Sequence, residues 1–188
     1  MEFVLIRHTR CDIEAGTCYG RLDVPLADSA PEDIERTLAQ TPPVDYVVCS
    51  PAQRCHRLAL ALGRRDGCEV RVEPALQELD FGAWEGLRWS EIPRTVSDEW
   101  AADPWHRAAP EGETECELWT RTARAAEEML RMTTTRRIAV ISHGGPLRIL
   151  RCLLTQQPLS ERWSWNIACG EVVHITAPPG SICPSSDP

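Results

Sequence analysis

Residues 2–10 read EFVLIRHTR, an apolar run that ends in a histidine flanked by arginines. The run is short and rich in residues that favour β-structure, which predicts a buried strand over Glu2–Arg7. His8 follows directly, with Arg7 before it and Arg10 two residues beyond. Permanent positive charges discourage protonation of a nearby imidazole. The segment therefore predicts a neutral, nucleophilic histidine at the end of a strand.

Apolar strands and helical segments alternate along the rest of the chain. Further strands are predicted over Val44–Cys49, Val70–Glu73, Arg137–Ile141 and Glu171–Thr176. Helices are predicted over Pro31–Ala39, from Pro51 to about Leu62, for one or two turns within Ser90–Val96, from Thr114 to about Arg131, and over Pro146–Leu154. This alternation predicts an α/β fold of three layers, in which helices cover both faces of a mostly parallel sheet.

The composition bounds the class of protein. We predict a single domain over residues 1–177 of the 188, and a disordered tail over 178–188, which is rich in proline and serine. A net charge of −8 argues against a protein that coats nucleic acid or an anionic membrane. With no signal-peptide pattern and no apolar run long enough to cross a membrane, a cytoplasmic location is expected. Monomer and homodimer both stay open.

The nine cysteines contain no CxxC pair. Several lie in apolar segments, where a reduced thiol behaves as a small hydrophobic side chain. They are predicted to be mainly buried free thiols in a reducing compartment, and a disulfide or metal role is the less favoured alternative.

Three predicted strands lead into residues that suit an anion. Arg7 and His8 end the first strand, Arg54 follows the second, and His143 follows the fourth. In an open α/β sheet, ligands bind beyond the carboxyl ends of the strands. These four side chains are therefore expected to meet at one edge of the sheet.

A phosphoryl group fits this edge. Arginine donates two parallel hydrogen bonds to phosphate and stays charged, and helix N-termini such as the one after His143 offer backbone N–H groups, including that of Gly144. A neutral histidine among such cations can attack phosphorus and form a covalent phosphohistidine. Metal binding by His8 and His143 would need a third ligand, and none stands at a telling spacing. We predict no metal and no cofactor.

The leaving oxygen needs a proton, and the stretch QELDFG at 77–82 offers carboxylates. A glutamate beside a bound phosphate dianion keeps a proton near neutral pH because like charges repel, so Glu78 is the predicted general acid. Asp80 and Glu85 lie close by in the sequence. A solvated surface charge is the alternative interpretation for each of the three.

Four segments in this order resemble the histidine phosphatase superfamily, the phosphoglycerate-mutase-like enzymes: Arg7-His8-Thr9, Ser50-Pro51-x-x-Arg54, Glu78 to Gly86, and Ser142 to Arg148. The resemblance implies the fold of that family and a metal-independent phosphatase. It implies that His8 is the phosphorylated nucleophile, that Glu78 is the proton donor, and that Arg7, Arg54 and His143 form the phosphate pocket. Thr9 stands where a glycine is common.

The segment CYGRLDVPL at 18–26 looks most like that of α-ribazole phosphatases, which remove the 5′-phosphate from the nucleotide that becomes the lower ligand of cobalamin. The resemblance implies α-ribazole 5′-phosphate as substrate and places Tyr19, Gly20 and Arg21 among the substrate contacts. For Arg10 and Arg21, substrate contact and a solvated surface position remain equal alternatives.

Other functions compete with this one. A phosphoglycerate mutase would use the same pocket but return the phosphate to another hydroxyl, and a broad-specificity sugar or nucleotide phosphatase would differ only in its leaving group. A non-catalytic phosphate-binding regulatory module is the alternative outside enzymes. The tryptophans between residues 84 and 105 either stack on a ring of the ligand or pack their segment onto the core. His56, His106 and His174 lack supporting neighbours and are interpreted as structural.

Overall fold

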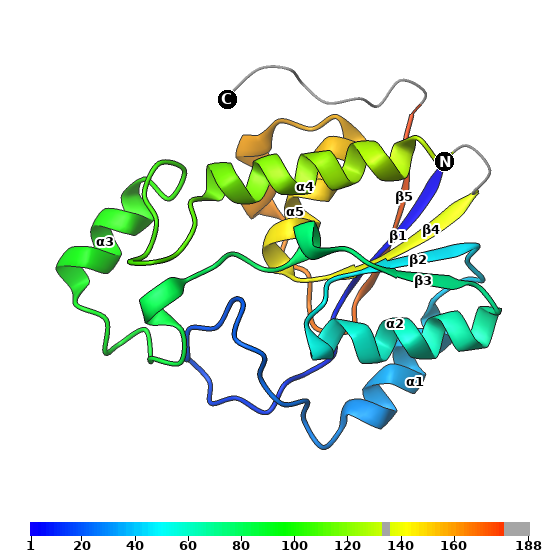
Figure 1. The fold of residues 1–188 in the computed structure, drawn as a ribbon, viewed down its shortest axis with the longest axis horizontal. Coiled ribbons are helices and arrows are strands. Elements are labelled where there is room, and N and C mark those ends of the chain that lie inside the picture. Colours follow the sequence, from blue (N-terminus) through cyan, green and yellow to red (C-terminus); the bar gives the residue numbers. More distant parts are fainter. Residues whose placement is uncertain (133–135, 179–188) are drawn as a thin grey trace.

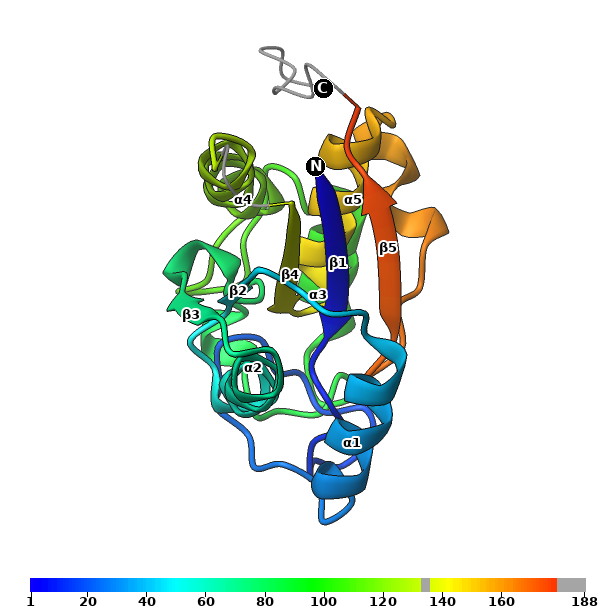
Figure 2. The same cartoon turned by 90° about the vertical axis from the view of Figure 1, so that its right-hand side faces the viewer.

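A central sheet of five strands organises the protein in the computed structural model, which describes residues 1–132 and 136–178. The strands lie in the order β3-β2-β4-β1-β5, as Figure 2 shows from left to right. Their bounds are β1 Glu2–Arg7, β2 Tyr46–Cys49, β3 Glu69–Val72, β4 Arg137–Ser142 and β5 Val172–Thr176. The first four strands run parallel and β5 is antiparallel to β1. The mostly parallel sheet is thereby confirmed.

The apolar run of β1 is buried on both faces of the sheet. Phe3 and Leu5 contribute to one core cluster, whereas Val4 and Ile6 contribute to the other. All four side chains are at most 1% exposed. Alternate residues of a strand point to opposite faces, so a continuous apolar run is what a strand between two layers requires.

Helices form the two outer layers (Figure 1). α4 (Glu115–Leu130) and α5 (Gly144–Thr155) pack on the face that carries Phe3 and Leu5. α1 (Ala30–Gln40) and α2 (Gln53–Asp66) pack on the opposite face. The predicted three-layer α/β architecture is therefore confirmed.

The starts of α2 and α5 differ from the predicted positions. The prediction that α2 starts at Pro51 is wrong, since the helix begins at Gln53, whose N–H donates to Asp23 Oδ1 at 3.0 Å. The Ser50 hydroxyl, predicted as the cap, lies 2.8 Å from His143 Nε2 instead. α5 begins at Gly144, earlier than predicted. In contrast, the predicted capping box of α4 is present at Thr114.

The segment between β3 and α4 extends away from the sheet (Figure 1). It contains the short 3-10 helices Pro74–Leu76 and Gly82–Trp84 and the helix α3 (Arg94–Ala102). α3 begins within the predicted segment Ser90–Val96 and continues beyond its end. Ring centroids of Trp84 and Trp100 are 5.7 Å apart. Trp100 also packs against the buried cluster of Leu79, Leu118 and Ile149, which agrees with the interpretation that the tryptophans pack this segment onto the core. A third 3-10 helix, Leu159–Ser164, follows α5.

Several predictions concern groups spread over the chain. The eight cysteines within the described ranges are free thiols, and Cys183 lies outside those ranges. Of the predicted tail, only Pro178 is among the described residues. No described helix is long and apolar enough to cross a membrane. Within residues 1–132 and 136–178, no group of three or more His, Cys, Asp or Glu side chains is arranged to hold a metal ion.

Candidate active site

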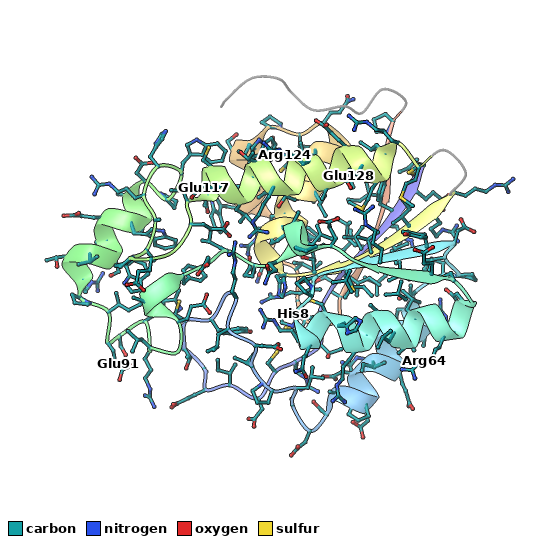
Figure 3. The ribbon with its side chains drawn as sticks, viewed as in Figure 1. His8, Arg64, Glu91, Glu117, Arg124 and Glu128 are labelled. Atoms are coloured by element: carbon teal, nitrogen blue, oxygen red, sulfur yellow. The ribbon has the colours of Figure 1, made fainter. Side chains whose placement is uncertain are left out.

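His8 follows β1 directly, at the end of the sheet where α2 starts (Figure 3). Its side chain is 2% exposed, and its Nδ1 lies 2.8 Å from the carbonyl oxygen of Thr9. A carbonyl only accepts, so Nδ1 carries the ring proton and Nε2 keeps a free lone pair. Burial, together with the charges of Arg54 and Arg7, lowers the pKa of His8 from 6.5 to about 3. The imidazole is therefore neutral at physiological pH.

His143 stands beside His8, with the two ring centroids 5.2 Å apart. Arg54 Nε donates to His143 Nδ1 at 3.3 Å, which requires Nδ1 to accept and leaves the proton on Nε2. Nε2 then donates to the Ser50 hydroxyl at 2.8 Å. Burial first, and then the nearby His8 and Arg54, hold the pKa of His143 well below 6.5. Both imidazoles thus have a defined tautomer.

Arg54 is the largest fully buried side chain of the described residues, at 1% exposure. Its Nη1 and Nη2 donate to the carbonyl oxygens of Leu22 and Gly20 at 2.8 and 2.5 Å, and its guanidinium lies 5.4 Å from the centre of the Tyr19 ring. Arg54 has no carboxylate partner among the described residues. A buried arginine without a counterion favours an anion at this place.

Two further polar groups beside His8 lack partners. Arg7 Nη1 donates to the carbonyl oxygen of Ile167 at 2.8 Å, but its Nε is buried and bonds to none of the described residues. The hydroxyl of Thr9 is likewise buried and bonds to none of the described residues, and Thr9 is 1% exposed. Buried donors are nearly always satisfied in folded proteins. Oxygen atoms of a phosphoryl group would satisfy both.

Glu78 places its carboxylate at the N-terminus of α5. The backbone N–H of Gly145 lies 3.2 Å from both Oε1 and Oε2, and that of Leu79 lies 3.0 Å from Oε1. A Cβ on Gly145 would collide with Oε1 and press on Leu118. The close approach therefore needs a glycine at position 145.

The two alternative carboxylates hold loops. Asp80 accepts from the N–H of Gly82 at 2.9 Å and pairs with Arg21 at 3.1 Å. Glu85 accepts from the N–H groups of Arg21 at 2.8 Å and Phe81 at 3.1 Å. Of the three carboxylates, Glu78 is the one at the helix end that follows His143.

The remaining predicted substrate contacts have partners within the protein. The Arg21 guanidinium lies between Asp80 and Glu113, at 3.1 and 3.0 Å, and Arg10 makes a two-pronged ion pair with the buried Asp33. Gly20 contributes its carbonyl to Arg54, and a Cβ on Gly20 would overlap the Leu79 carbonyl. Contacts of these residues with a ligand stay predictions.

No role was predicted for Arg148, although it closes the last of the four motifs. Its Nη1 lies 4.0 Å from the point where a Cβ of Gly144 would stand, and Glu78 Oε2 lies 3.8 Å from the same point. The Nε of Arg148 donates to the carbonyl of Trp165 at 3.0 Å. Burial lowers its pKa. Arg148 adds a further positive charge at the start of α5.

The neutral histidines make stability depend on pH. The unfolded chain protonates each imidazole below about pH 6.5, whereas the fold keeps both pKa values far lower. Below that pH the unfolded state binds more protons, so stability falls as the pH falls. We expect a loss of about 1.4 kcal/mol per histidine between about pH 7.5 and about pH 5.5, measured by urea unfolding.

The same measurement on His8→Gln tests the contribution of His8, and His174→Gln is the matched control. His174 is an exposed residue of β5, so its replacement should leave the pH dependence as in the parent protein. His8→Gln should reduce the dependence. If the free energy of unfolding changed equally with pH in the two variants, the neutral state of His8 would be contradicted.

Comparisons with known proteins show which family the chain matches. The model of the histidine phosphatase superfamily (branch 1) matches residues 3–182. Phosphoserine phosphatase 1 of Hydrogenobacter thermophilus is 26% identical over 184 residues, 93% of this chain and 87% of the relative. The adenosylcobalamin/alpha-ribazole phosphatase of Salmonella typhimurium is 26% identical over 177 residues, 90% of this chain and 87% of the relative. A solved structure, the alpha-ribazole phosphatase from Shigella flexneri, has a TM-score of 0.85 at 20% identity and covers 100% of both chains, which shows a shared fold.

Proposed function

This chain belongs to the histidine phosphatase superfamily and is a phosphatase, and on that premise we propose that it hydrolyses phosphomonoesters through a covalent phosphohistidine at His8. The observation that carries the proposal is the protonation pattern of His8. Its Nδ1 proton is held by the Thr9 carbonyl, so Nε2 is the nucleophilic atom. Burial and the nearby arginines keep that atom unprotonated, with a pKa of about 3.

The proposed reaction has two steps, transfer of the phosphoryl group to His8 and hydrolysis of the phosphohistidine. In the first, the Nε2 lone pair of His8 attacks phosphorus, the bond from phosphorus to the ester oxygen breaks, and Glu78 gives its proton to that oxygen. In the second, water attacks phosphorus, the bond from phosphorus to Nε2 breaks and returns its electron pair to His8, the Glu78 carboxylate takes a proton from the water, and phosphate leaves. Arg7, Arg54 and the N–H of Gly144 hold the phosphoryl oxygens through both steps, and His143 joins them when its Nε2 proton turns from the Ser50 hydroxyl to the bound phosphoryl group.

The proposed substrate is α-ribazole 5′-phosphate. The segment at 18–26 and the similarity to the Salmonella enzyme of that name support this choice. The phosphoserine phosphatase relative makes L-phosphoserine the second candidate. We propose one catalytic domain over residues 1–177, acting on a small phosphorylated substrate in the cytoplasm, as a monomer or homodimer.

A panel of phosphomonoesters tests the proposal. We expect free phosphate from several esters and the highest kcat/KM with α-ribazole 5′-phosphate, compared with L-phosphoserine, sugar phosphates and nucleotides. With 3-phosphoglycerate, free phosphate is expected, whereas 2-phosphoglycerate as the product would identify a mutase. A protein that binds phosphate but turns over none of these esters would be a binding module, and the proposal would be wrong.

A further inference from the structure

Glu113, in the turn before α4, gathers two arginines and a backbone N–H on one carboxylate. Arg121 donates to it from Nη2 at 2.5 Å and from Nε at 3.1 Å. Arg21 Nη2 donates at 3.0 Å, and the N–H of Asp80 donates at 3.1 Å. The Glu113 side chain is 11% exposed. A carboxylate buried to this extent with four donors fixes the position of each donor.

Arg121 connects Glu113 to the segment that carries Glu78, the proposed proton donor. This set of contacts is called the first arm of the cluster. Arg121, on α4, donates from Nη1 to the carbonyl oxygens of Ala75 and Gln77 at 2.7 and 2.6 Å. Its Nη2 donates to the carbonyl of Glu78 at 2.9 Å. Three carbonyls of the segment that carries Glu78 are thereby bound to one guanidinium. The carboxylate of Glu113 holds that guanidinium in place.

Arg21 connects Glu113 to the loop that binds Arg54, in the proposed phosphate pocket. This set of contacts is called the second arm. Arg21 lies between Gly20 and Leu22, whose carbonyl oxygens bind the two terminal nitrogens of Arg54. The Arg21 side chain bonds to Glu113 and Asp80, which ties this loop to the segment after Glu78. The position of Arg54 therefore depends on a loop that the same carboxylate holds together with Asp80 and Glu85.

We propose that Glu113 is a positioning residue for both halves of the active site, acting through Arg121 on Glu78 and through Arg21 on Arg54. The inference rests on the proposed function, because it takes Glu78 as the acid and Arg54 as a phosphate ligand. Glu113 touches no reacting atom in this scheme. It sets the distance between the group that binds the phosphoryl oxygens and the group that protonates the leaving oxygen, which is the geometry that positioning controls.

The test uses Glu113→Gln, which keeps the shape of the side chain and removes its charge. Glu128→Gln is the matched control, because Glu128 also sits on an arginine, Arg71, but at the surface. Two esters report on the two arms: glycerol 3-phosphate, whose alkoxide needs a proton, and p-nitrophenyl phosphate, whose leaving group departs as a stable anion.

We expect Glu113→Gln to lower kcat with glycerol 3-phosphate by about 10- to 100-fold. With p-nitrophenyl phosphate the rate of the first step, read from the burst of p-nitrophenolate, should fall much less, while KM should rise for both esters. Partial unfolding would scale both rates by the same factor, so the difference between the esters isolates positioning. Glu128→Gln should behave as the parent protein does.

Single variants at Arg121 and Arg21 test the two arms one at a time. Arg121→Met should reproduce the loss of kcat with glycerol 3-phosphate, and Arg121→Lys should recover part of it because a cation remains. Arg21→Met should reproduce the rise in KM. In the Glu113→Gln background each of these changes should add little, since residues of one network are not additive. A full additional effect of Arg21→Met there would show direct substrate contact instead.

The results distinguish a failure of the proposed function from a failure of the proposed role of Glu113. If the parent protein hydrolyses neither ester, the proposed function fails. If it hydrolyses both and Glu113→Gln matches Glu128→Gln, the function stands and the inference is overturned. Should Glu113→Gln not fold, Arg121→Met and Arg121→Lys decide, because equal losses with the two esters in both variants would also overturn the inference.

Discussion

The variant His8→Ala is expected to lose phosphatase activity by about 10⁴-fold or more, since the removal of a covalent nucleophile takes away the whole two-step route. The lone pair on His8 Nε2 is the one that the local hydrogen bonds leave free. His143 cannot take its place in this geometry, because His143 accepts from Arg54 on one nitrogen and donates to Ser50 from the other.

Two measurements check this expectation. The first is kcat/KM for p-nitrophenyl phosphate in His8→Ala and in His8→Asn, which leaves a smaller cavity in the buried site. The second is the mass of the intact protein after rapid mixing with substrate, which should show one added phosphoryl group in the parent protein and none in either variant. His174→Ala serves as the exposed control. Hydrolysis by His8→Ala at the parent rate would remove His8 from the mechanism.

The variant Glu78→Gln is expected to discriminate strongly between leaving groups. General acid catalysis contributes about 10² to 10⁴ in rate. Glycerol 3-phosphate hydrolysis should fall by about that factor. With p-nitrophenyl phosphate the burst of p-nitrophenolate, which reports the first step alone, should slow by less than about tenfold because this leaving group needs no proton. The glutamine keeps the size of the side chain and can still accept from the N–H of Gly145. The fold should be undisturbed.

Gly145→Ala tests the same point without touching the carboxylate. The added Cβ would overlap Glu78 Oε1, so the flexible end of Glu78 has to move. The same discrimination between the two esters is expected, at a smaller size. Glu91→Gln, an exposed carboxylate that accepts from the N–H of Arg88, is the control. Equal losses of the first-step rate with both esters in Glu78→Gln would contradict its role as the acid.

The strands were predictable because their environment is simple. β1 and β4 lie in the middle of the sheet and are covered on both faces, so their apolar runs are continuous and end where the sheet ends. The residues after those runs, His8 and His143, were predictable for the same reason. Parallel strands bring their carboxyl ends to one edge wherever they stand in the sequence.

Helix starts were less predictable because distant groups compete with local caps. Ser50 followed by Pro51 is a strong local signal for a helix start. The tertiary structure instead pairs the Ser50 hydroxyl with His143 and lets Asp23 accept from the first N–H of α2. Both partners lie far from Ser50 in the sequence, so no window of neighbouring residues contains the information.

The positioning groups were missed for a related reason. Arg121 contacts backbone carbonyls more than forty residues away, and a carbonyl leaves no trace in the residue types of a sequence. Glu113 stands just before the N-cap residue Thr114, and its residue type does not distinguish it from the acidic residues of the first turn, Glu115 and Glu117. Motifs that touch phosphate are visible as residue types at strand ends, whereas the groups that hold them in place depend on the tertiary structure.

The place of β4 between β1 and β2 also bears on how the chain is made. β1 and β2 have both left the ribosome long before Arg137, the first residue of the strand that joins them, is synthesised. Until then the growing chain carries two apolar strands with unpaired edges and no common neighbour, a state that invites aggregation. A polypeptide terminated before Ser142 would lack the second imidazole, so the proposed site stays incomplete until β4 and the residue after it have been made.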